Sequence, residues 1–287
     1  MALRYPTISF LSDYGLDDEF VGIVKSIIRA IAPDVAVIDI THAIPPHDVR
    51  AGGLALARSA QYLCPGVVLA VVDPGVGTDR RAIAVEVGDG ASVLVGPDNG
   101  LLAAAVAMVG GATAAVELTN ADYHLPSLGP TFAGRDVFAP VAAHLCAGVP
   151  LAAFGDAIDP HELTPGVLPL SRVEGDTLAA EVLWVDRFGN LQLNVDPDEI
   201  AVFGDRVRLR LRDGDRIGVR AETYAGIRTG EIGVIVDSYG LVAIAVDRGS
   251  AAAELNLHAG DAVTFAPIGD EPSTRSSNVR ITPRGKE

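Results

Sequence analysis

Residues 67–77 read VVLAVVDPGVG, an apolar run that stops at an aspartate and a Pro-Gly turn. An unbroken apolar run of this length, bounded by turn residues, is typical of a strand buried on both faces of a sheet. Outward from it, similar apolar runs stand at 7–11, 35–40, 82–87 and 93–95, and helical patterns at 20–31, 48–62, 100–108 and 135–147. Apolar strands that alternate with helices predict an α/β domain with a largely parallel central sheet.

The pattern changes after Pro169, where short apolar strands follow one another and no helical stretch of ten residues intervenes. The strands expected here are 178–185, 191–195, 207–211, 217–221, 232–236 and 242–246. The turn sequence at 237–240, DSYG, is a hairpin signal between the last two. We therefore predict an α/β domain over 1–169, a small all-β, barrel-like domain over 176–271 and a flexible tail over 272–287.

Composition excludes several classes of partner. The 287 residues include 37 acidic and 22 basic side chains, a formal net charge of -15. A field of that sign repels phosphate backbones and anionic membranes, so we expect neither nucleic acid nor a membrane as partner. Hydrophobic residues make up 49% of the chain, which excludes disorder over most of its length.

Cysteine usage and the N-terminus indicate the compartment. Cys64 and Cys146 are too few for a disulfide framework or a Cys-rich zinc site, and they suggest a reducing environment. The first residues, MALRYPTISF, lack the long apolar segment of a signal peptide. We therefore expect a soluble, cytoplasmic protein.

Polar side chains follow the apolar strands of the first half. They are Asp13, His42, Asp73, and Asp98 with Asn99. In open α/β sheets, ligands bind beyond the carboxyl ends of the strands. An aspartate after a strand can equally cap the next helix, so position alone leaves both interpretations open for each residue.

The loop after Asp73 is tight enough to fold Arg80 back beside the carboxylate. The two would form either an acid–guanidinium pair at a reaction site or a loop salt bridge of small energetic value. Other signatures are missing: the sequence has no P-loop, no G-x-G-x-x-G after a strand and no G-x-S-x-G elbow. His42, His47 and Asp48 match no standard metal motif, so we expect no metal site.

Several motifs together resemble the S-adenosyl-L-methionine (SAM) hydroxide adenosyltransferase family, the SAM hydrolases, which is related to the fluorinase and the chlorinase. They are SDYG with DD at 12–18, VDPGVGT with Arg80 at 72–80, GPDNGLL at 96–102, TFAGRD at 131–136, DRFGN at 186–190, GE at 230–231 and SYG at 238–240. They run through nearly the whole chain. The resemblance implies an N-terminal α/β domain, a C-terminal β-barrel and a homotrimer with sites between neighbouring subunits.

The resemblance also implies the reaction, in which SAM and water give adenosine and L-methionine. SAM is the substrate, and no cofactor is expected. Asp73 and Arg80 would be catalytic, and Asp13 would grip the ribose hydroxyls. Because the leaving group is a neutral thioether, the chemistry needs one well-placed, activated water: Arg80 can favour hydroxide, and Asp73 can orient the water or take its proton.

For the rest of the substrate, the resemblance assigns residues of the second half. Asp186 would take the ammonium group of methionine, and Ser238 its carboxylate. The adenine pocket would comprise Asn190, Tyr224 and backbone near Val246, with Phe188 packing beside it.

One position departs from the family pattern. The family's TF-H-G-R-D motif carries a catalytic histidine where this chain has Ala133. Loss of such a group costs about 10²–10⁴ in rate. The chain is then a slow enzyme, a natural variant that uses another residue, or a form in which alanine was introduced to trap substrate. Because the surrounding motif is intact, we favour an introduced alanine and a weakened or inactivated enzyme.

Three other functions compete with hydrolysis. Ala133 favours a SAM- or adenosine-binding protein without useful catalysis. A 5′-halogenase of the same superfamily is disfavoured because Asp73 would repel a halide and because the connection at 87–92 is short. A SAM-dependent methyltransferase would need a Gly-rich loop after the first strand, which residues 13–16, DYGL, do not supply.

Overall fold

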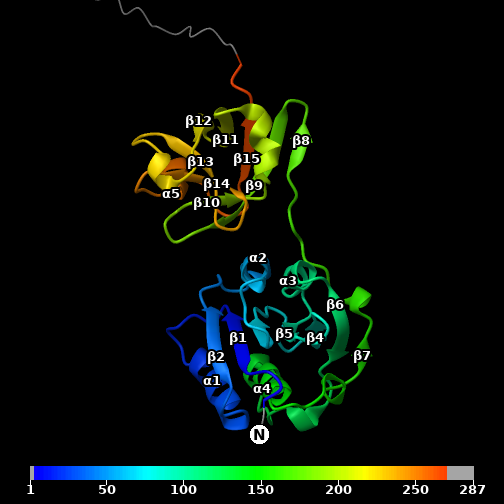
Figure 1. Ribbon diagram of the computed structural model, residues 1–287. Coiled ribbons are helices and arrows are strands. Elements are labelled where there is room, and N and C mark those ends of the chain that lie inside the picture. Colours follow the sequence, from blue (N-terminus) through cyan, green and yellow to red (C-terminus); the bar gives the residue numbers. More distant parts are fainter. Residues whose placement is uncertain (1–2, 270–287) are drawn as a thin grey trace, which may run out of the picture. The chain divides into compact units, whose positions relative to one another are not determined.

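The computed structural model describes residues 3–269, and the chain divides into two compact units that meet in sequence at Pro169 and Leu170 (Figure 1). Each unit encloses its own cluster of buried apolar side chains. The predicted tail over 272–287 lies outside the described residues.

The described part of the N-terminal unit is built on a seven-stranded sheet in the order β2-β1-β3-β5-β4-β6-β7. The strands are β1 (Thr7–Ser12), β2 (Ala36–Thr41), β3 (Val67–Val71), β4 (Ala82–Val87), β5 (Ser92–Pro97), β6 (Ala112–Glu117) and β7 (Ala157–Ile158). Strands β2, β1, β3 and β5 run parallel, whereas β4, β6 and β7 extend the sheet through antiparallel pairs. The antiparallel half follows from the turn at 88–91, which is too short for a crossover helix between β4 and β5.

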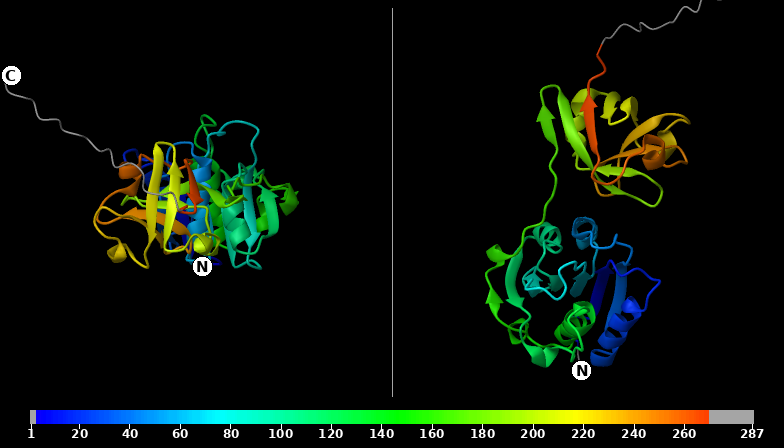
Figure 2. Two further views of the ribbon diagram at one scale, coloured as in Figure 1. Left: turned by 90° about the horizontal axis from the view of Figure 1, so that it is seen from above. Right: turned by 180° about the vertical axis from the view of Figure 1, so that it is seen from behind.

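Helices cover both faces of this sheet (Figure 1), and the same layers are seen from behind in Figure 2. On one face α1 (Phe20–Ile31) packs beside α4 (Ala139–Cys146); on the other α2 (Val49–Ala60) packs beside α3 (Ala103–Met108). Alternate residues of β3 supply both cores, Leu69 to the first and Val68 to the second. The predicted α/β domain is therefore confirmed.

The C-terminal unit is a seven-stranded barrel. Its strands are β9 (Thr177–Val185), β10 (Leu191–Leu193), β11 (Arg206–Leu211), β12 (Gly214–Arg220), β13 (Ile232–Val236), β14 (Val242–Val246) and β15 (Ala262–Ala266), with β8 (Arg172–Glu174) paired to β9 outside it. Pairing of β10 with both β14 and β9 closes the barrel. Its core includes Leu178, Leu209 and Phe265, and the short helix α5 (Ala251–Leu255) packs beside β14. The predicted barrel is confirmed.

Strand β15 is the element of the barrel that no sequence pattern above predicts. It is short, and it lies between β11 and β9, far from both in sequence. Within residues 3–269, every helix falls short of the length or the apolar character that a membrane-spanning helix needs.

Candidate active site

Four parallel strands of the N-terminal unit end at one edge of the sheet, and a polar residue follows each of them. Across the sheet these are His42 after β2, Asp13 after β1, Asp73 after β3 and Asp98 after β5. Parallel strands bring their carboxyl ends to the same edge, so these predicted residues lie in one row. Their contacts separate residues that hold the fold from residues that are available for a ligand.

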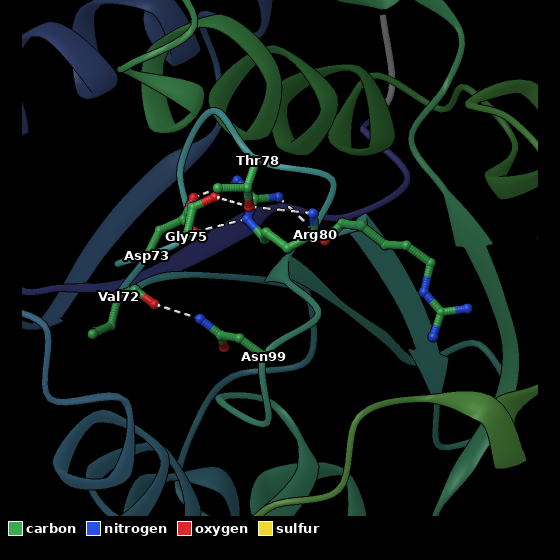
Figure 3. A network of polar contacts seen from close by, with 7 residues as sticks. Val72, Asp73, Gly75, Thr78, Arg80 and Asn99 are labelled. Carbon is green, nitrogen blue, oxygen red and sulfur yellow. Dashed lines mark hydrogen bonds and ion pairs between the residues drawn. The ribbon is translucent and has the colours of Figure 1, made fainter.

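Asp73 and Arg80 form a two-point ion pair in the loop after β3 (Figure 3). Arg80 Nε donates to Asp73 Oδ1 at 2.7 Å, and Arg80 Nη2 donates to Asp73 Oδ2. The side chains are 6% exposed for Asp73 and 15% for Arg80. Within the loop, the Thr78 hydroxyl donates to Gly75 O at 2.6 Å, so the turn predicted to fold Arg80 back toward the carboxylate does so.

Arg80 makes two further contacts, with the backbone of Arg81 and with the ring of Phe138. Its Nη1 donates to Arg81 O at 3.2 Å, and its guanidinium lies 5.3 Å from the ring centroid of Phe138. Charge-assisted two-point pairs fix geometry as well as energy. The strand end therefore carries a carboxylate and a guanidinium locked in one relative orientation.

Asn99 fixes the base of this loop rather than facing a ligand. Its amide nitrogen donates to Val72 O at 2.9 Å (Figure 3), and its amide oxygen accepts from Leu101 N at 3.1 Å. Asn99 thus ties the end of β3 to the chain after β5. The carbonyl it holds belongs to the residue directly before Asp73.

Asp98 has a structural role. Its Oδ2 accepts from Arg81 Nε at 2.9 Å and from Arg81 Nη2 at 2.6 Å, while its Oδ1 accepts from Thr164 N at 2.8 Å. The side chain is 3% exposed. These bonds tie the chain after β5 to the segment around Thr164, and they occupy the carboxylate.

His42 holds the loops after β1 and β2 together. Its Nδ1 lies 2.8 Å from the Ser12 hydroxyl, its Nε2 lies 3.1 Å from Asp39 Oδ1, and its carbonyl accepts from Gly15 N at 2.8 Å. Partial burial raises the pKa of Asp39, but hydrogen bonds from Lys25 and His42 outweigh it and hold that pKa below its ordinary value. His42 itself is buried and acts inside the fold.

Asp13 lies next to this network and faces the loop before α2. Its Oδ2 accepts from His47 N at 2.9 Å, and His47 has a left-handed backbone, with φ of 68°. Such conformations are uncommon for histidine and concentrate at functional sites. Asp48 caps α2 by accepting from Ala51 N at 2.8 Å. No three His, Cys, Asp or Glu side chains are grouped to hold a metal ion in the described range.

Ala133 lies at the start of a π-helix, Gly134–Phe138, that leads into α4. The following carboxylate, Asp136, is 7% exposed and paired with Arg135, whose Nε donates to Asp136 Oδ1 at 2.6 Å. That pair orders the segment without contributing a free acid or base. The side chain of Ala133 brings no polar atom.

Sequence reasoning missed Tyr14 in the N-terminal site. Its ring packs against Phe132, and its hydroxyl lies against Gly134. Burial raises the pKa of Tyr14 above its ordinary value, and the negative charges of Asp13 and Asp73 add to that rise. The sequence signal was limited to its place directly after Asp13.

The C-terminal unit has a pocket of about 1050 Å³. Five predicted substrate-binding residues line it: Asp186, Phe188, Asn190, Tyr224 and Val246. Four polar residues that the sequence did not indicate line it as well, namely Arg228, Thr229, Asp247 and Arg248. The structure therefore gathers the residues assigned to adenine, together with Asp186, in one cavity.

The turn at 186–190 shapes one wall of this pocket. Asp186 Oδ1 accepts from the backbone nitrogens of Phe188 and Asn190, both at 2.8 Å, and Oδ2 accepts from Asn190 Nδ2 at 2.8 Å. Gly189 has a φ of 84°, and a Cβ there would overlap the hydroxyl of Ser250, the N-cap of α5. Phe188 is left 76% exposed at the turn.

Ser238 lies outside the residues that line the pocket, in the exposed turn between β13 and β14. Asp237 orders that turn by accepting from Tyr239 N at 2.9 Å and from Leu241 N at 3.1 Å. Burial raises the pKa of Tyr224, and the charges of Asp186 and Asp237 raise it further. Asp237 therefore acts electrostatically on the pocket, although Ser238 does not line it.

Both units match models of one family. The N-terminal domain model of the SAM hydroxide adenosyltransferases matches residues 8–155, and the C-terminal domain model matches residues 180–264. Over 256 residues the chain is 48% identical to the protein named (R)-S-adenosyl-L-methionine hydrolase in Salinispora tropica, spanning 89% of this chain and 96% of that protein. A protein of the same name in Thermus thermophilus is 40% identical over 260 residues, spanning 88% and 96%.

More distant relatives and a solved structure complete the comparison. The protein named fluorinase in an Actinoplanes species is 29% identical over 290 residues, spanning 90% of this chain and 97% of that protein. A crystal structure of an uncharacterized conserved protein from Thermotoga maritima superposes with a TM-score of 0.83 at 36% identity, spanning 90% of this chain and 99% of that one.

Proposed function

The chain belongs to the SAM hydroxide adenosyltransferase family, and from that membership we propose that it hydrolyses SAM to adenosine and L-methionine. The observation that carries the proposal is the buried pair of Asp73 and Arg80 at the carboxyl end of β3. It offers a proton acceptor and a fixed positive charge side by side. Attack by water needs both, because the nucleophile gains negative character as it loses its proton.

In the proposed reaction, a water bound next to Asp73 attacks C5′ of SAM in line with the sulfur. The C5′–O bond forms while the C5′–S bond breaks, and the electron pair of that bond goes to sulfur. Methionine leaves as a neutral thioether, and the proton of the water passes to Asp73. Arg80 favours the hydroxide form of the nucleophile, and holding the reactants in line supplies further acceleration.

Substrate contacts are assigned on both units. Asp13 would bind the ribose hydroxyls, Asp186 the ammonium group of methionine and Ser238 its carboxylate. Asn190, Tyr224 and backbone near Val246 would hold adenine, with Phe188 beside it. The shared pocket of the barrel supports the adenine assignment, since it is lined by Asn190, Tyr224, Phe188 and Val246.

We further propose that the protein acts as a homotrimer with sites between neighbouring subunits. The support is the family resemblance and the division of the assigned residues between the two units. Subunit mixing tests it: Asp73→Asn and Tyr224→Ala chains, each impaired alone, should regain activity when refolded or co-expressed together. The trimer proposal would be contradicted if the mixed chains were no more active than either variant alone, or if sedimentation gave the mass of a monomer.

The proposed reaction needs no cofactor, because the leaving group departs without protonation and without redox change. Exhaustive dialysis against a metal chelator should therefore leave turnover unchanged. We place the reaction in the cytoplasm, since Cys64 and Cys146 are both free thiols.

Ala133 supports a second candidate function, binding of SAM or adenosine without useful turnover. Incubation with SAM followed by chromatography separates the two, because only an enzyme accumulates adenosine beyond one equivalent of protein. A halogenase is a weaker candidate: the fluorinase relatives are at 29% identity against 48% for the hydrolase, and the Asp73 carboxylate would repel a halide. Added chloride or fluoride should give no 5′-halogenated adenosine.

A further inference from the structure

The hydroxyl of Tyr14 lies against Gly134, the residue next to Ala133, and the reaction described above leaves this phenol unused. Its ring lies in a cage of aromatic side chains, with centroid distances of 6.5 Å to Phe10, 5.7 Å to Phe20 and 5.6 Å to Phe132. The contacts with Phe10 and Phe132 are edge-to-face, and such contacts fix the orientation of a ring. The hydroxyl of Tyr14 is therefore held in one place.

The position of the Tyr14 hydroxyl depends on the glycine at position 134. A Cβ at Gly134 would overlap the Tyr14 hydroxyl oxygen and would lie 3.0 Å from Tyr14 Cζ. Gly134 is buried and begins the π-helix before α4. Glycine at this position makes room for the hydroxyl, and neighbouring Ala133 brings no polar atom that could satisfy it.

The surroundings of the hydroxyl are polar but do not bind it. It makes no hydrogen bond to any residue of 3–269, although the charges of Asp13, Asp73 and Arg80 all act on it. Burial raises its pKa, the two carboxylates raise it further and Arg80 opposes them, so the phenol stays protonated at neutral pH. Tyr14 is half-buried and its hydroxyl is not among the enclosed polar atoms of the described residues, so a ligand atom or water can reach it and complete its hydrogen bonds.

We propose that the Tyr14 hydroxyl is a third polar contact to the attacking water, beside Asp73 and Arg80. This inference rests on the proposed function. A neutral phenol donates one hydrogen bond and accepts others. It can accept a hydrogen bond from the water while the water donates its other hydrogen to Asp73, which leaves a lone pair of the water facing C5′. Bonds and protons balance as before: the water's proton goes to Asp73, and the phenol keeps its own.

The test is Tyr14→Phe, which keeps the ring in its aromatic cage and removes only the hydroxyl. We expect kcat for adenosine release to fall by about 10²–10³, as on loss of one preorganised polar contact in an active site, with KM for SAM within about twofold. The matched control is Tyr123→Phe, in the same unit, where the ring packs against Phe154 and His144 outside the site. That variant should retain its kcat.

A second variant moves the hydroxyl instead of removing it. Gly134→Ala keeps the phenol but places a methyl group where the hydroxyl lies, so kcat should fall in the same direction. In the Tyr14→Phe background, Gly134→Ala should lower kcat much less, because the contact between the hydroxyl and the water is already absent. Melting temperatures of all variants separate loss of turnover from loss of fold.

The inference is overturned if Tyr14→Phe keeps kcat within about twofold of the unaltered chain, if Tyr123→Phe falls equally, or if the loss lies wholly in KM. The same series separates this failure from failure of the proposed function. If the unaltered chain releases no adenosine while an Ala133→His chain does, SAM hydrolysis stands, and Tyr14→Phe is measured in the Ala133→His background, where a kcat kept within about twofold overturns the role of Tyr14. If both bind SAM and neither releases adenosine, the proposed function falls, and the role of Tyr14 with it.

Discussion

The guanidinium of Arg80 holds the carboxylate of Asp73 through two nitrogens, and its neighbour Arg81 holds Asp98 in a similar way. Two consecutive arginines thus serve the ends of two adjacent parallel strands, β3 and β5. The pairs differ in what else they bind: Asp98 also accepts from the Thr164 backbone, whereas the Asp73 carboxylate is bound by Arg80 alone among residues 3–269. The Asp73–Arg80 pair is therefore available for the reaction, whereas the Asp98–Arg81 pair stabilises the fold.

This difference gives a matched pair of variants. Asp73→Asn removes the proton acceptor and should lower kcat by about 10²–10⁴. Asp98→Asn should instead lower the free energy of unfolding, by about 1.5–3 kcal/mol as for the loss of charge-assisted hydrogen bonds, and leave kcat of the folded fraction within a few-fold. Steady-state kinetics and urea denaturation measure the two effects. Equal losses of kcat in both variants would contradict the assignment.

The pocket of the barrel should bind the nucleoside through its aromatic side chains. Stacking of a base on an aromatic ring is worth about 1–3 kcal/mol, so Tyr224→Ala or Phe188→Ala should raise the Kd for adenosine by about 5- to 150-fold. Calorimetry with adenosine measures this. The control is Val202→Ala, an exposed apolar residue of the same unit outside the pocket, which should leave the Kd unchanged.

Two histidines of the N-terminal unit should make the fold less stable in acid. Burial lowers the pKa of both His124 and His144. The unfolded chain then binds more protons than the folded one at low pH. The contribution of these histidines to the free energy of unfolding is therefore fully present above the ordinary histidine pKa of about 6.5, and it is lost as the pH drops below that value. Thermal melts between pH 8 and 5 should show a smaller fall in the His124→Gln/His144→Gln double variant. An identical pH dependence in both proteins would exclude this origin.

The two thiols should differ in reactivity. Cys64 is exposed, whereas Cys146 is buried, and burial raises its pKa to about 12. Thiolate is the reactive form, so an alkylating reagent at pH 8 should add one label to the native protein and two after denaturation. Intact-mass spectrometry counts the labels. Rapid labelling of Cys146 in the native state would mean that the core around α4 opens readily.

Much of the fold could be predicted from local patterns, because the parallel strands are unbroken apolar runs and the β13–β14 hairpin has a turn signature at 237–240. The features that the local patterns did not predict depend on pairing between strands that are far apart in the sequence or on the length of one turn. The antiparallel half of the first sheet follows from one short turn, and β15 is defined by its neighbours β11 and β9 rather than by its own five residues.

The candidate site divides in the same way. The position of Asp73 and the return of Arg80 are local consequences of one loop, so the sequence indicates them. The contact of Tyr14 with Gly134 joins the end of β1 to the π-helix before α4 and depends on the packing of three aromatic rings. The charged residues Arg228 and Asp247 enter the barrel pocket from separate loops, which no motif in either loop indicates.

Restoring a histidine tests the departure at Ala133. If the alanine removes a catalytic group, Ala133→His should raise kcat by about 10²–10⁴ and change SAM binding little. A variant that binds SAM as tightly and turns over no faster would show that this chain does not lack a group at that position. In that case Tyr14, Asp73 and Arg80 would be the polar set on which turnover depends.

Hydrolysis itself is tested most directly by following the oxygen. The chain and its Ala133→His variant are incubated with SAM in heavy-oxygen water, and the products are analysed by liquid chromatography and mass spectrometry. We predict adenosine that carries the heavy oxygen at its 5′ position, methionine without it, and faster formation with the histidine variant. SAM binding without adenosine from either protein, or adenosine without the label, would contradict hydrolysis by attack of water on C5′.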